Sequence, residues 1–277
     1  MQFAYLIMAH DNEWQLKKLL KLLDRQKNDI FLHIDLKAKD AFHFEELKDI
    51  VKKARIHIFS KYSVYWGTIS QTRCQVFLLK QAIKFHHDYY HLLSGSDLPI
   101  KKLDEIECFF MKNQGKQFVH YESNGYCTKE NSKRYFLFEN HKKLNDLSLN
   151  IQRKLKIERH LYCGANWYSI TEELAQDFIK NSKRMLAKVW FTRNSDEYIL
   201  QTFLKKRIGK YELWSEEENN YYAIMRAIDW NRGTPYVWRE KDYEELMHSD
   251  YLFARKFDEK IDSDIIEMIC DYVEERE

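Results

Sequence analysis

The chain has 277 residues, of which 44% are hydrophobic and 32% charged, so one large α/β domain or two small ones can form with a sizeable core. Its 45 basic and 43 acidic residues give a formal net charge of +2, which argues against a dedicated nucleic-acid binder. Only two prolines and seven glycines occur, which leaves little material for disordered linkers.

Strand and helix patterns alternate over the first hundred residues. Apolar runs typical of buried strands occupy residues 3–9, 29–35, 55–59 and 89–93. Helical periodicity or helix-forming polar composition occupies residues 13–23, 42–54 and 69–85. Strands that alternate with helices of this length predict an α/β fold, with a mostly parallel sheet flanked by helices.

The pattern is less regular from about residue 118 onward. We expect strands at 118–121 and 165–170, helices at 172–181 and 197–206, an exposed acidic loop at 215–220 and a closing helix at 261–277. No break in composition marks a domain boundary. We therefore predict a single domain over residues 1–277.

Polar residues follow three of the predicted strands. The clusters are His10-Asp-Asn12, His33-Ile-Asp35 and Ser94-Gly-Ser-Asp97. In an open parallel sheet, ligands bind beyond the carboxyl ends of the strands, where Asp35 can meet a ribose or base and Asp97 a sugar hydroxyl. Either acid is equally well explained as a helix cap or turn former.

Several nucleotide-binding fingerprints are absent. The sequence has no GxGxxG after its first strand and no GxxxxGK[ST]. No Asp-x-Asp follows a strand in the middle of the chain, since 262–264 lies in the terminal helix region. A departing diphosphate would then need positive side chains, which the Arg- and Lys-rich segment 226–256 can supply.

The cysteines and the first apolar run indicate the cellular compartment in which the protein is expected. The five cysteines are scattered and form no CxxC pair, so we expect no zinc site, no disulfide framework and a reducing cytoplasm. They are Cys74, Cys108, Cys127, Cys163 and Cys270. The run 3–9 is too short to span a membrane and follows no basic region, so we expect a soluble protein or one attached to membranes only through its surface.

Seven short motifs occur in the order found in one family. They are Ala4-Tyr-Leu-Ile-Met-Ala-His10, Phe31-Leu-His-Ile-Asp35, Tyr65-Trp-Gly67, His91-Leu-Leu-Ser-Gly-Ser-Asp-Leu-Pro-Ile-Lys101, Gly164-Ala-Asn-Trp-Tyr-Ser169, Ser195-Asp-Glu197 and Leu252-Phe-Ala-Arg-Lys-Phe-Asp258. In this order the chain resembles the core-2/I-branching N-acetylglucosaminyltransferases and peptide O-xylosyltransferases. The resemblance implies a GT-A-like, Rossmann-type fold, a UDP-sugar donor, inversion at the anomeric carbon, and no divalent metal or other cofactor.

The resemblance also implies roles for matching residues. Glu197 resembles the catalytic base, Lys256 a diphosphate ligand and Asp35 a uridine contact. An arginine of the family binds the diphosphate, and Arg226 is the first choice for it, with Arg232 the second. Other donor contacts are assigned to His10 and Asp97.

Acceptor contacts are less certain from the sequence. Trp167 and Tyr168 are either strand-core aromatics or a platform on which an acceptor sugar stacks. Glu122 and Arg134 stand where ligands of acceptor hydroxyls are expected, although solvated surface residues explain them as well. We expect residues 1–115 to form the nucleotide-binding half, and residues 116–277 the acceptor-binding and catalytic half.

The chain departs from animal members of this family. We expect it to lack their N-terminal anchor, their luminal disulfide pattern and much of an insertion before the lysine motif. We therefore expect a bacterial-type cytoplasmic member, with a peripheral position at the inner face of the membrane as an alternative. Its acceptor is then a glycan or polysaccharide, with a lipid-linked form included, as in the assembly of surface polysaccharides.

Two other classes of function compete with a glycosyltransferase. One is a catalytically inactive protein that binds a sugar nucleotide or a glycan, which the presence of both Glu197 and Lys256 disfavours. The other is a nucleic-acid-binding protein, which the near-neutral charge disfavours. The leading hypothesis transfers N-acetylglucosamine, or xylose as the second choice.

Overall fold

The fold is built on a six-stranded sheet, seen here in a computed structural model that describes residues 1–123, 132–138, 141–207 and 209–274. The strand order is β3-β2-β1-β4-β7-β6. Strands β1 to β4 pair in parallel, whereas β7 and β6 run antiparallel at one edge. The bounds are β1 Phe3–Ala9, β2 Asn28–Ile34, β3 Arg55–Phe59, β4 Tyr89–Ser94, β6 Phe118–Val119 and β7 Tyr168–Thr171.

Strand β1 lies inside the sheet and is buried on both faces. Tyr5 and Ile7 point into one hydrophobic cluster, and Ala4 and Leu6 point into the other. Because side chains alternate between the two faces of a strand, a strand covered on both sides needs apolar residues at nearly every position. The continuous apolar run 3–9 satisfies that need.

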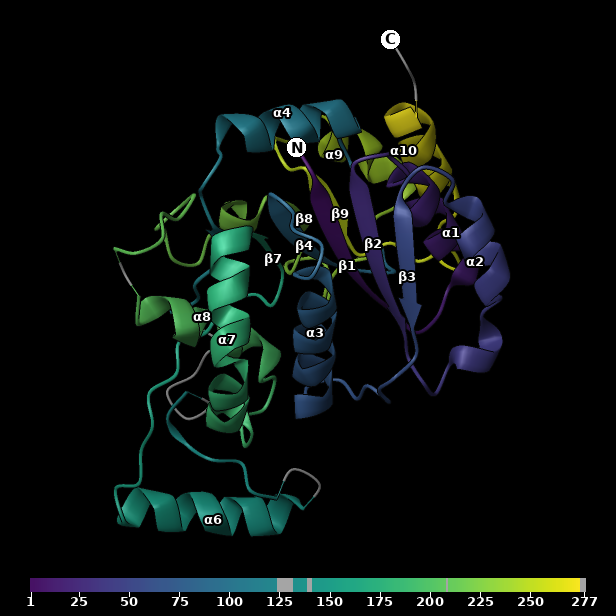
Figure 1. Cartoon of the computed structure of the whole chain (residues 1–277). Coiled ribbons are helices and arrows are strands. Elements are labelled where there is room, and N and C mark those ends of the chain that lie inside the picture. The colour runs from purple at the N-terminus through teal and green to yellow at the C-terminus, as the bar shows by residue number, and fades with distance from the viewer. Residues whose placement is uncertain (124–131, 139–140, 208, 275–277) are drawn as a thin grey trace.

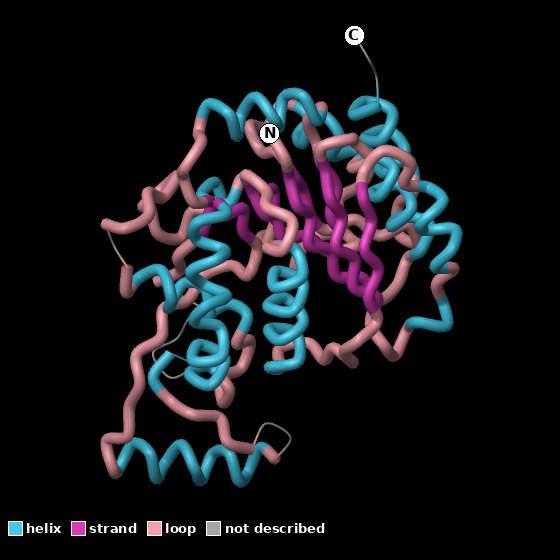
Figure 2. Tube along the Cα trace, viewed as in Figure 1, coloured by secondary structure: helices cyan, strands magenta, loops and turns pink. Residues whose placement is uncertain are grey.

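Helices cover both faces of the sheet (Figures 1 and 2). Helices α1, α2 and α10 contribute to one cluster, and α3, α7 and α8 to the other. Helix α4 packs Ile106 and Phe110 against the first cluster. The bounds are α1 Glu13–Leu22, α2 Phe44–Ile50, α3 Ile69–Ala82, α4 Leu103–Lys112, α7 Glu172–Val189, α8 Asp196–Lys205 and α10 Asp264–Glu274.

A second, three-stranded sheet follows the order β5-β9-β8. It brings the segment just after β4 against two strands from the last quarter of the chain, with Asp97 opposite Arg255. Its strands are β5 Asp97–Pro99, β8 Arg226–Ile228 and β9 Phe253–Arg255. Short helical turns near it are η2 Tyr221–Ile224, η3 Glu240–Asp242 and α9 Tyr243–Met247, while η1 Lys39–Ala41 precedes α2.

Helix α6, Lys142–Lys154, lies apart from the two sheets. It stands at the end of two extended segments, beyond the lower end of α7 in Figure 1. The labelled chain ends lie at the opposite end of the molecule, near α4 and α10.

The sequence predicted the fold class and most of the elements. The α/β class with a mostly parallel sheet is confirmed, and the strand predicted at 55–59 has the bounds observed for β3. The helix predicted at 42–54 is shorter, and the helix predicted at 172–181 continues to Val189. Helices α4 and α6 and the second sheet were not predicted.

The cysteine prediction needs a correction. Cys163 is disulfide-bonded, and its partner lies outside the described residues. Cys74, Cys108 and Cys270 are free thiols. Sequence spacing could not reveal the bridge, because a disulfide depends on three-dimensional distance rather than on a local pattern.

The described helices were also compared with the length and hydrophobicity that a membrane-spanning helix requires. None of them is both long enough and apolar enough to cross a lipid bilayer.

Candidate functional site

Three strands end together at one edge of the main sheet. Strand β1 pairs with both β2 and β4, so residues 10, 35 and 94–97 follow neighbouring strand ends. Backbone hydrogen bonds join the three turns, with the Asp35 amide donating to Ala9 and the Gly95 amide to Met8. The three polar segments therefore lie together at this edge.

Asp35 and His10 occupy this edge in different ways. The carboxylate of the buried Asp35 accepts from the amides of Lys37 and Val64, at 2.9 and 3.2 Å. It therefore fixes the loop that runs from 60 to 67 beside β2. His10 is exposed, with its Nε2 atom 3.6 Å from Asp11.

Asp97 holds an arginine that the sequence analysis did not select. Its Oδ1 atom accepts from Arg255 Nη1 at 2.9 Å and from the Ser94 hydroxyl at 2.8 Å, while its Oδ2 atom accepts from the Ser94 amide. The Arg255 guanidinium also lies 4.1 Å from the centre of the Trp167 ring. Arg255 is thus fixed at the carboxyl edge of the sheet, next to Lys256.

Arg226, the first-choice diphosphate ligand, is a fully buried residue. Its Nη1 atom donates to the Ile224 carbonyl, and its Nη2 atom donates to the Tyr168 carbonyl at 2.8 Å. Burial lowers its pKa to about 10, although Asp97 nearby favours its charge. The guanidinium therefore joins β8 to β4 and β7, and the geometry favours Arg255 over it as a donor contact.

Arg232, the second choice, belongs to an acidic cluster outside the sheet edge. It pairs with Asp229, with Asp242 at 2.9 Å and with Glu245 at 3.0 Å. Lys256 differs, since its ammonium forms no ion pair within the described part of the chain. A lysine of that kind can still turn toward an anion.

The predicted base, Glu197, lies in the first turn of α8 and is partly buried. Its carbonyl accepts from the Gly164 amide at 2.9 Å, and the Glu122 amide donates to Cys163. A Cβ atom on Gly164 would lie 1.8 Å from the His120 carbonyl oxygen, so only glycine allows this close approach. The contact brings the 120–122 and 163–166 segments beside the base.

The start of α8 is braced from the start of α3. The Asn194 amide donates to the Gly67 carbonyl at 2.7 Å, and the hydroxyls of Ser195 and Thr72 lie 2.6 Å apart. Gly67 has φ +73°, and a Cβ atom there would meet the Asn194 side chain at 2.5 Å. The loop held by Asp35 at one end therefore positions the base segment at the other.

Asp196 and Glu197 have separate environments although they are adjacent. Asp196 is 5% exposed and accepts from Gln71 Nε2 at 2.7 Å and Asn166 Nδ2 at 3.0 Å. Burial raises the pKa of Asp196 to about 6. Asn166 precedes Trp167, so two consecutive residues join the base segment to Arg255.

A second glutamate lies near the base. Glu122 is 3.8 Å from His120 Nε2, and the His120 ring stacks on Tyr221 with 4.4 Å between centroids. Burial, with added effects of Glu122 and Glu197, raises the pKa of Tyr221 to about 12. The two carboxylates and Tyr221 therefore share one electrostatic environment, which sequence spacing did not reveal.

The surroundings of two predicted acceptor contacts, Tyr168 and Arg134, favour a structural role. Tyr168 is 6% exposed and packs in the second hydrophobic cluster, which agrees with the strand-core interpretation. Arg134 donates to the Ile157 carbonyl and pairs with Glu158 at 3.1 Å, which ties together the two segments that carry α6.

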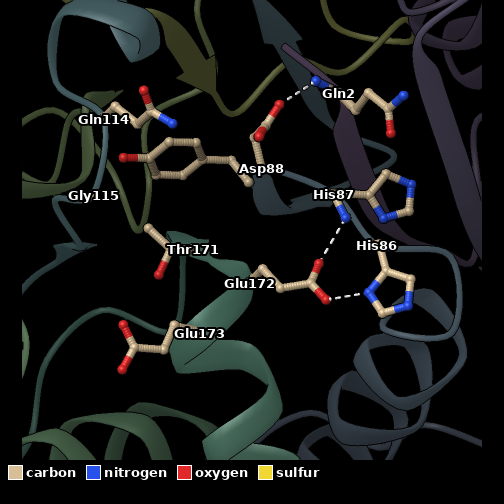
Figure 3. A pocket seen from close by; sticks show the side chains of 10 residues that line it. Gln2, His86, His87, Asp88, Gln114, Gly115, Thr171, Glu172 and Glu173 are labelled. Carbon is tan, nitrogen blue, oxygen red and sulfur yellow. Dashed lines mark hydrogen bonds and ion pairs between the residues drawn. The ribbon is translucent and has the colours of Figure 1, made fainter.

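The structure was also searched for metal ligands and for cavities away from this edge. Over the described ranges, no three His, Cys, Asp or Glu side chains are grouped as metal ligands would be. A cavity of about 590 Å³ opens at the other end of β4, where Glu172 accepts from the His87 amide and pairs with His86 (Figure 3). Several of its polar groups bond to one another, and we assign the cavity no function.

The chain was compared with known protein families and with individual proteins. The family model described as "Branch: Core-2/I-Branching enzyme" matches residues 3–252. Xylosyltransferase sqv-6 of Caenorhabditis briggsae is 26% identical over 92% of this chain and 34% of its own length. A bovine beta-1,3-galactosyl-O-glycosyl-glycoprotein beta-1,6-N-acetylglucosaminyltransferase is 23% identical over 98% of this chain and 69% of its own.

The chain spans about a third of the length of the xylosyltransferases that it matches. Among solved structures, mouse xyloside xylosyltransferase 1 aligns with 91% of this chain and 97% of its own, at 9% identity and a TM-score of 0.41. A likeness at that score adds nothing to the family match.

The raised pKa of Asp196 predicts a pH-dependent effect on stability. Because its folded pKa of about 6 exceeds its ordinary value of 3.8, the carboxyl stabilises the fold fully below about pH 4, and this contribution is lost as the pH rises through 6. Asp196→Asn removes the dependence. Relative to the parent, the variant's free energy of unfolding should rise by roughly 2–3 kcal/mol between about pH 4 and pH 7, measured by urea denaturation. A difference that stays constant with pH would contradict the shift.

Proposed function

Since this chain belongs to the Core-2/I-Branching enzyme family of glycosyltransferases, we propose that it moves a sugar from a UDP-sugar to a hydroxyl of a glycan or polysaccharide, with inversion and without a metal ion. Glu197 is the general base in this proposal. Arg255 and Lys256 neutralise the departing diphosphate.

One observation carries the proposal. Asn166 binds Asp196 at the start of the base helix, and Trp167 stacks on Arg255 at the sheet edge. The helix turn that carries Glu197 and a fixed cation are therefore connected through two consecutive residues. Single displacement at an anomeric carbon requires this pair, a base on the acceptor side and positive charge on the leaving-group side.

The reaction follows from those two requirements. The acceptor oxygen attacks the anomeric carbon and forms the new C–O bond, while the bond from that carbon to the β-phosphate oxygen breaks. Glu197 takes the acceptor proton, which later passes to solvent. The electron pair of the broken bond leaves on UDP, whose charge Arg255 and Lys256 balance.

The charges at the sheet edge favour an anionic leaving group. Arg226 and Arg255 lie near the same carboxylate, Asp97, so the pair of guanidinium groups keeps a positive excess there. Lys256 adds a further cation. Fixed cations in a partly buried site stabilise a developing phosphate charge more strongly than they would in water.

Aromatic side chains favour a sugar on the acceptor side. Tyr221 stacks on His120 and lies 6.4 Å, between centroids, from the half-exposed Trp230. Ring faces of this kind pack against the C–H faces of sugars, and Glu122 beside them can accept from a sugar hydroxyl. We propose Glu122 and Tyr221 as acceptor contacts, with Trp167 between donor and acceptor.

The first prediction concerns the donor. UDP-N-acetylglucosamine, or UDP-xylose as the second choice, should raise the thermal unfolding midpoint, and EDTA should leave the shift unchanged. UDP alone and the corresponding GDP-sugars serve as comparisons. A shift that appears only with added Mn²⁺ or Mg²⁺ would overturn the metal-independent mechanism.

The second prediction separates the cations. Lys256→Ala should weaken UDP binding by about tenfold or more in titration calorimetry, because a charge-assisted hydrogen bond to phosphate contributes roughly 1.5–3 kcal/mol. Lys260→Ala, an exposed lysine four residues further on, is the matched control and should bind UDP as the parent does.

Arginine variants extend that comparison. Arg255→Lys should weaken UDP binding, whereas Arg232→Ala should not, since Arg232 is engaged by acidic residues. Parental affinity in both Arg255→Lys and Lys256→Ala would remove these two residues from the donor site.

The third prediction tests the base. Glu197→Gln keeps the side-chain shape but cannot take a proton, so transfer should slow by about two orders of magnitude or more while UDP affinity is retained. Asp196→Asn and Glu122→Gln are the adjacent and the neighbouring carboxylate controls. Asp196→Asn should keep kcat, and Glu122→Gln should change KM for the acceptor more than kcat.

The readout is UDP release, with slow donor hydrolysis as a substitute until an acceptor is found. A large loss of kcat in Glu122→Gln, with Glu197→Gln active, would move the base to Glu122. Donor binding without turnover in the parent, over a broad acceptor panel, would favour the catalytically inactive alternative.

A further inference from the structure

Helix α6 exposes its apolar side. Leu144, Leu147, Ile151 and Leu155 recur at intervals of three and four residues, which places them on one face of the helix. Leu147 is 57% and Leu155 65% exposed, and the other two are also exposed. A helix of a water-soluble fold normally turns this face toward the core.

The buried side of α6 combines one leucine, Leu149, with the side-chain amides of Asn145 and Gln152. Gln152 donates to the Tyr135 carbonyl at 2.8 Å and accepts from the Tyr135 amide at 2.9 Å. Asn145, which is 2% exposed, accepts from the Phe138 amide. Side-chain amides therefore attach the helix to the extended segment before it. The orientation of the apolar stripe toward solvent is fixed by these hydrogen bonds.

Basic residues border the stripe. Lys143 and Lys154 are separated by three helical turns and share a face with Leu147, next to the stripe. Residues 141–157 contain five basic residues and one acidic residue, whereas the rest of the chain contains 40 basic and 42 acidic residues. The positive charge of the chain is thus concentrated around this helix.

The C-terminal end of α7 also combines exposed apolar side chains with basic residues. The Arg159 guanidinium, on the segment that follows α6, donates to the Lys188 and Phe191 carbonyls and joins the two regions. Trp190 and Phe191 are exposed there. Burial and the neighbouring cations Lys206 and Arg184 hold the pKa of Lys188 at about 8. Exposed aromatics and clustered cations therefore accompany the apolar stripe.

We propose that α6 docks on the surface of a lipid bilayer that contains anionic lipid, with its leucine stripe among the headgroups. An amphipathic helix of low mean hydropathy with lysines beside its apolar face is typical of this mode of binding. Lysines at the edge of the stripe can bury their alkyl chains and keep the ammonium at the phosphate level. The surrounding positive charge complements the negative lipid headgroups.

A second copy of the chain fits the stripe less well. Packing two α6 helices would bring the Lys143 and Lys154 edges together, and the single acid of the helix, Asp146, lies on another face. Like charges at such an interface oppose association. The charge pattern therefore favours lipid over self-association.

Docking would also orient the proposed active site. The insertion that carries α6 leaves the fold after Glu122 and returns before Cys163, and both residues lie beside the Glu197 segment. This orientation rests on the proposed function, whereas the docking itself does not. A bilayer contacted by α6 would lie on the side of the molecule from which an acceptor attached to lipid reaches the base.

Vesicle co-sedimentation tests the docking. The full chain should sediment with phosphatidylcholine vesicles in which about a third of the lipid is phosphatidylglycerol, and much less with pure phosphatidylcholine. Added salt should weaken the binding. Lys143→Gln with Lys154→Gln should reduce partitioning by about 30-fold, and Leu147→Gln with Ile151→Gln by at least about tenfold.

Met111→Gln is the matched control, since Met111 is also 57% exposed but lies on α4, at the other end of the molecule. It should sediment as the parent does, and all variants should keep the parental thermal midpoint and UDP-sugar shift. Absence of parental sedimentation, or equal binding to both vesicles at every salt concentration, would overturn the proposal. A second result would also overturn it. In that result the parent does not bind vesicles but forms a dimer, and Leu147→Gln with Ile151→Gln converts this dimer to a monomer.

Discussion

The ion pair between Asp97 and Arg255 lies in the second sheet, and both side chains contact Ser94 at the end of β4 in the main sheet. Asp97 is 1% exposed and begins β5, just after β4, while Arg255 comes from β9, more than 150 residues away in the chain. A buried carboxylate without its cation is costly, so each partner requires the other. The same guanidinium stacks on Trp167 and faces the edge where the parallel strands end. One contact therefore serves folding and places positive charge at the site.

The base segment depends on a different kind of constraint. The two adjacent acids have different surroundings. Asp196 accepts hydrogen bonds from Gln71 and Asn166, whereas Glu197 is partly exposed. The buried acid fixes the first turn of α8, and the partly exposed acid is the one that we propose as the base. Gly67 and Gly164 let two backbone segments approach this turn more closely than any side chain would permit.

The hydrophobic periodicity of the sequence predicted the elements that local interactions determine. Strands buried on both faces, such as β1, are continuous apolar runs, and their common edge follows from parallel pairing. The second sheet was missed because its three-residue strands are too short to show a period. Arg255 stood in a motif that resembles the family, beside Lys256, yet its role depends on Asp97 and Trp167. Those contacts join distant segments, which a one-dimensional pattern cannot reveal.

Helix α6 was missed for a related reason. Its apolar and polar residues have the expected period, but four of its apolar residues are exposed, and the buried face holds Asn145 and Gln152 beside a single leucine, Leu149. Rules that assign apolar residues to the core would have oriented it backwards. The extended segment around Tyr135 satisfies the amide side chains, and this choice of partner is set by tertiary structure.

The placement of the chain ends has a consequence for modular architecture. Strand β1 begins near the labelled ends and finishes at the site, a distance of roughly 20 Å for seven residues. Sequence joined before β1 or after α10 would therefore extend from the side opposite the site. Modules joined there would lie away from the edge that we propose as the site. A core arranged in this way is suited to reuse within proteins of very different size.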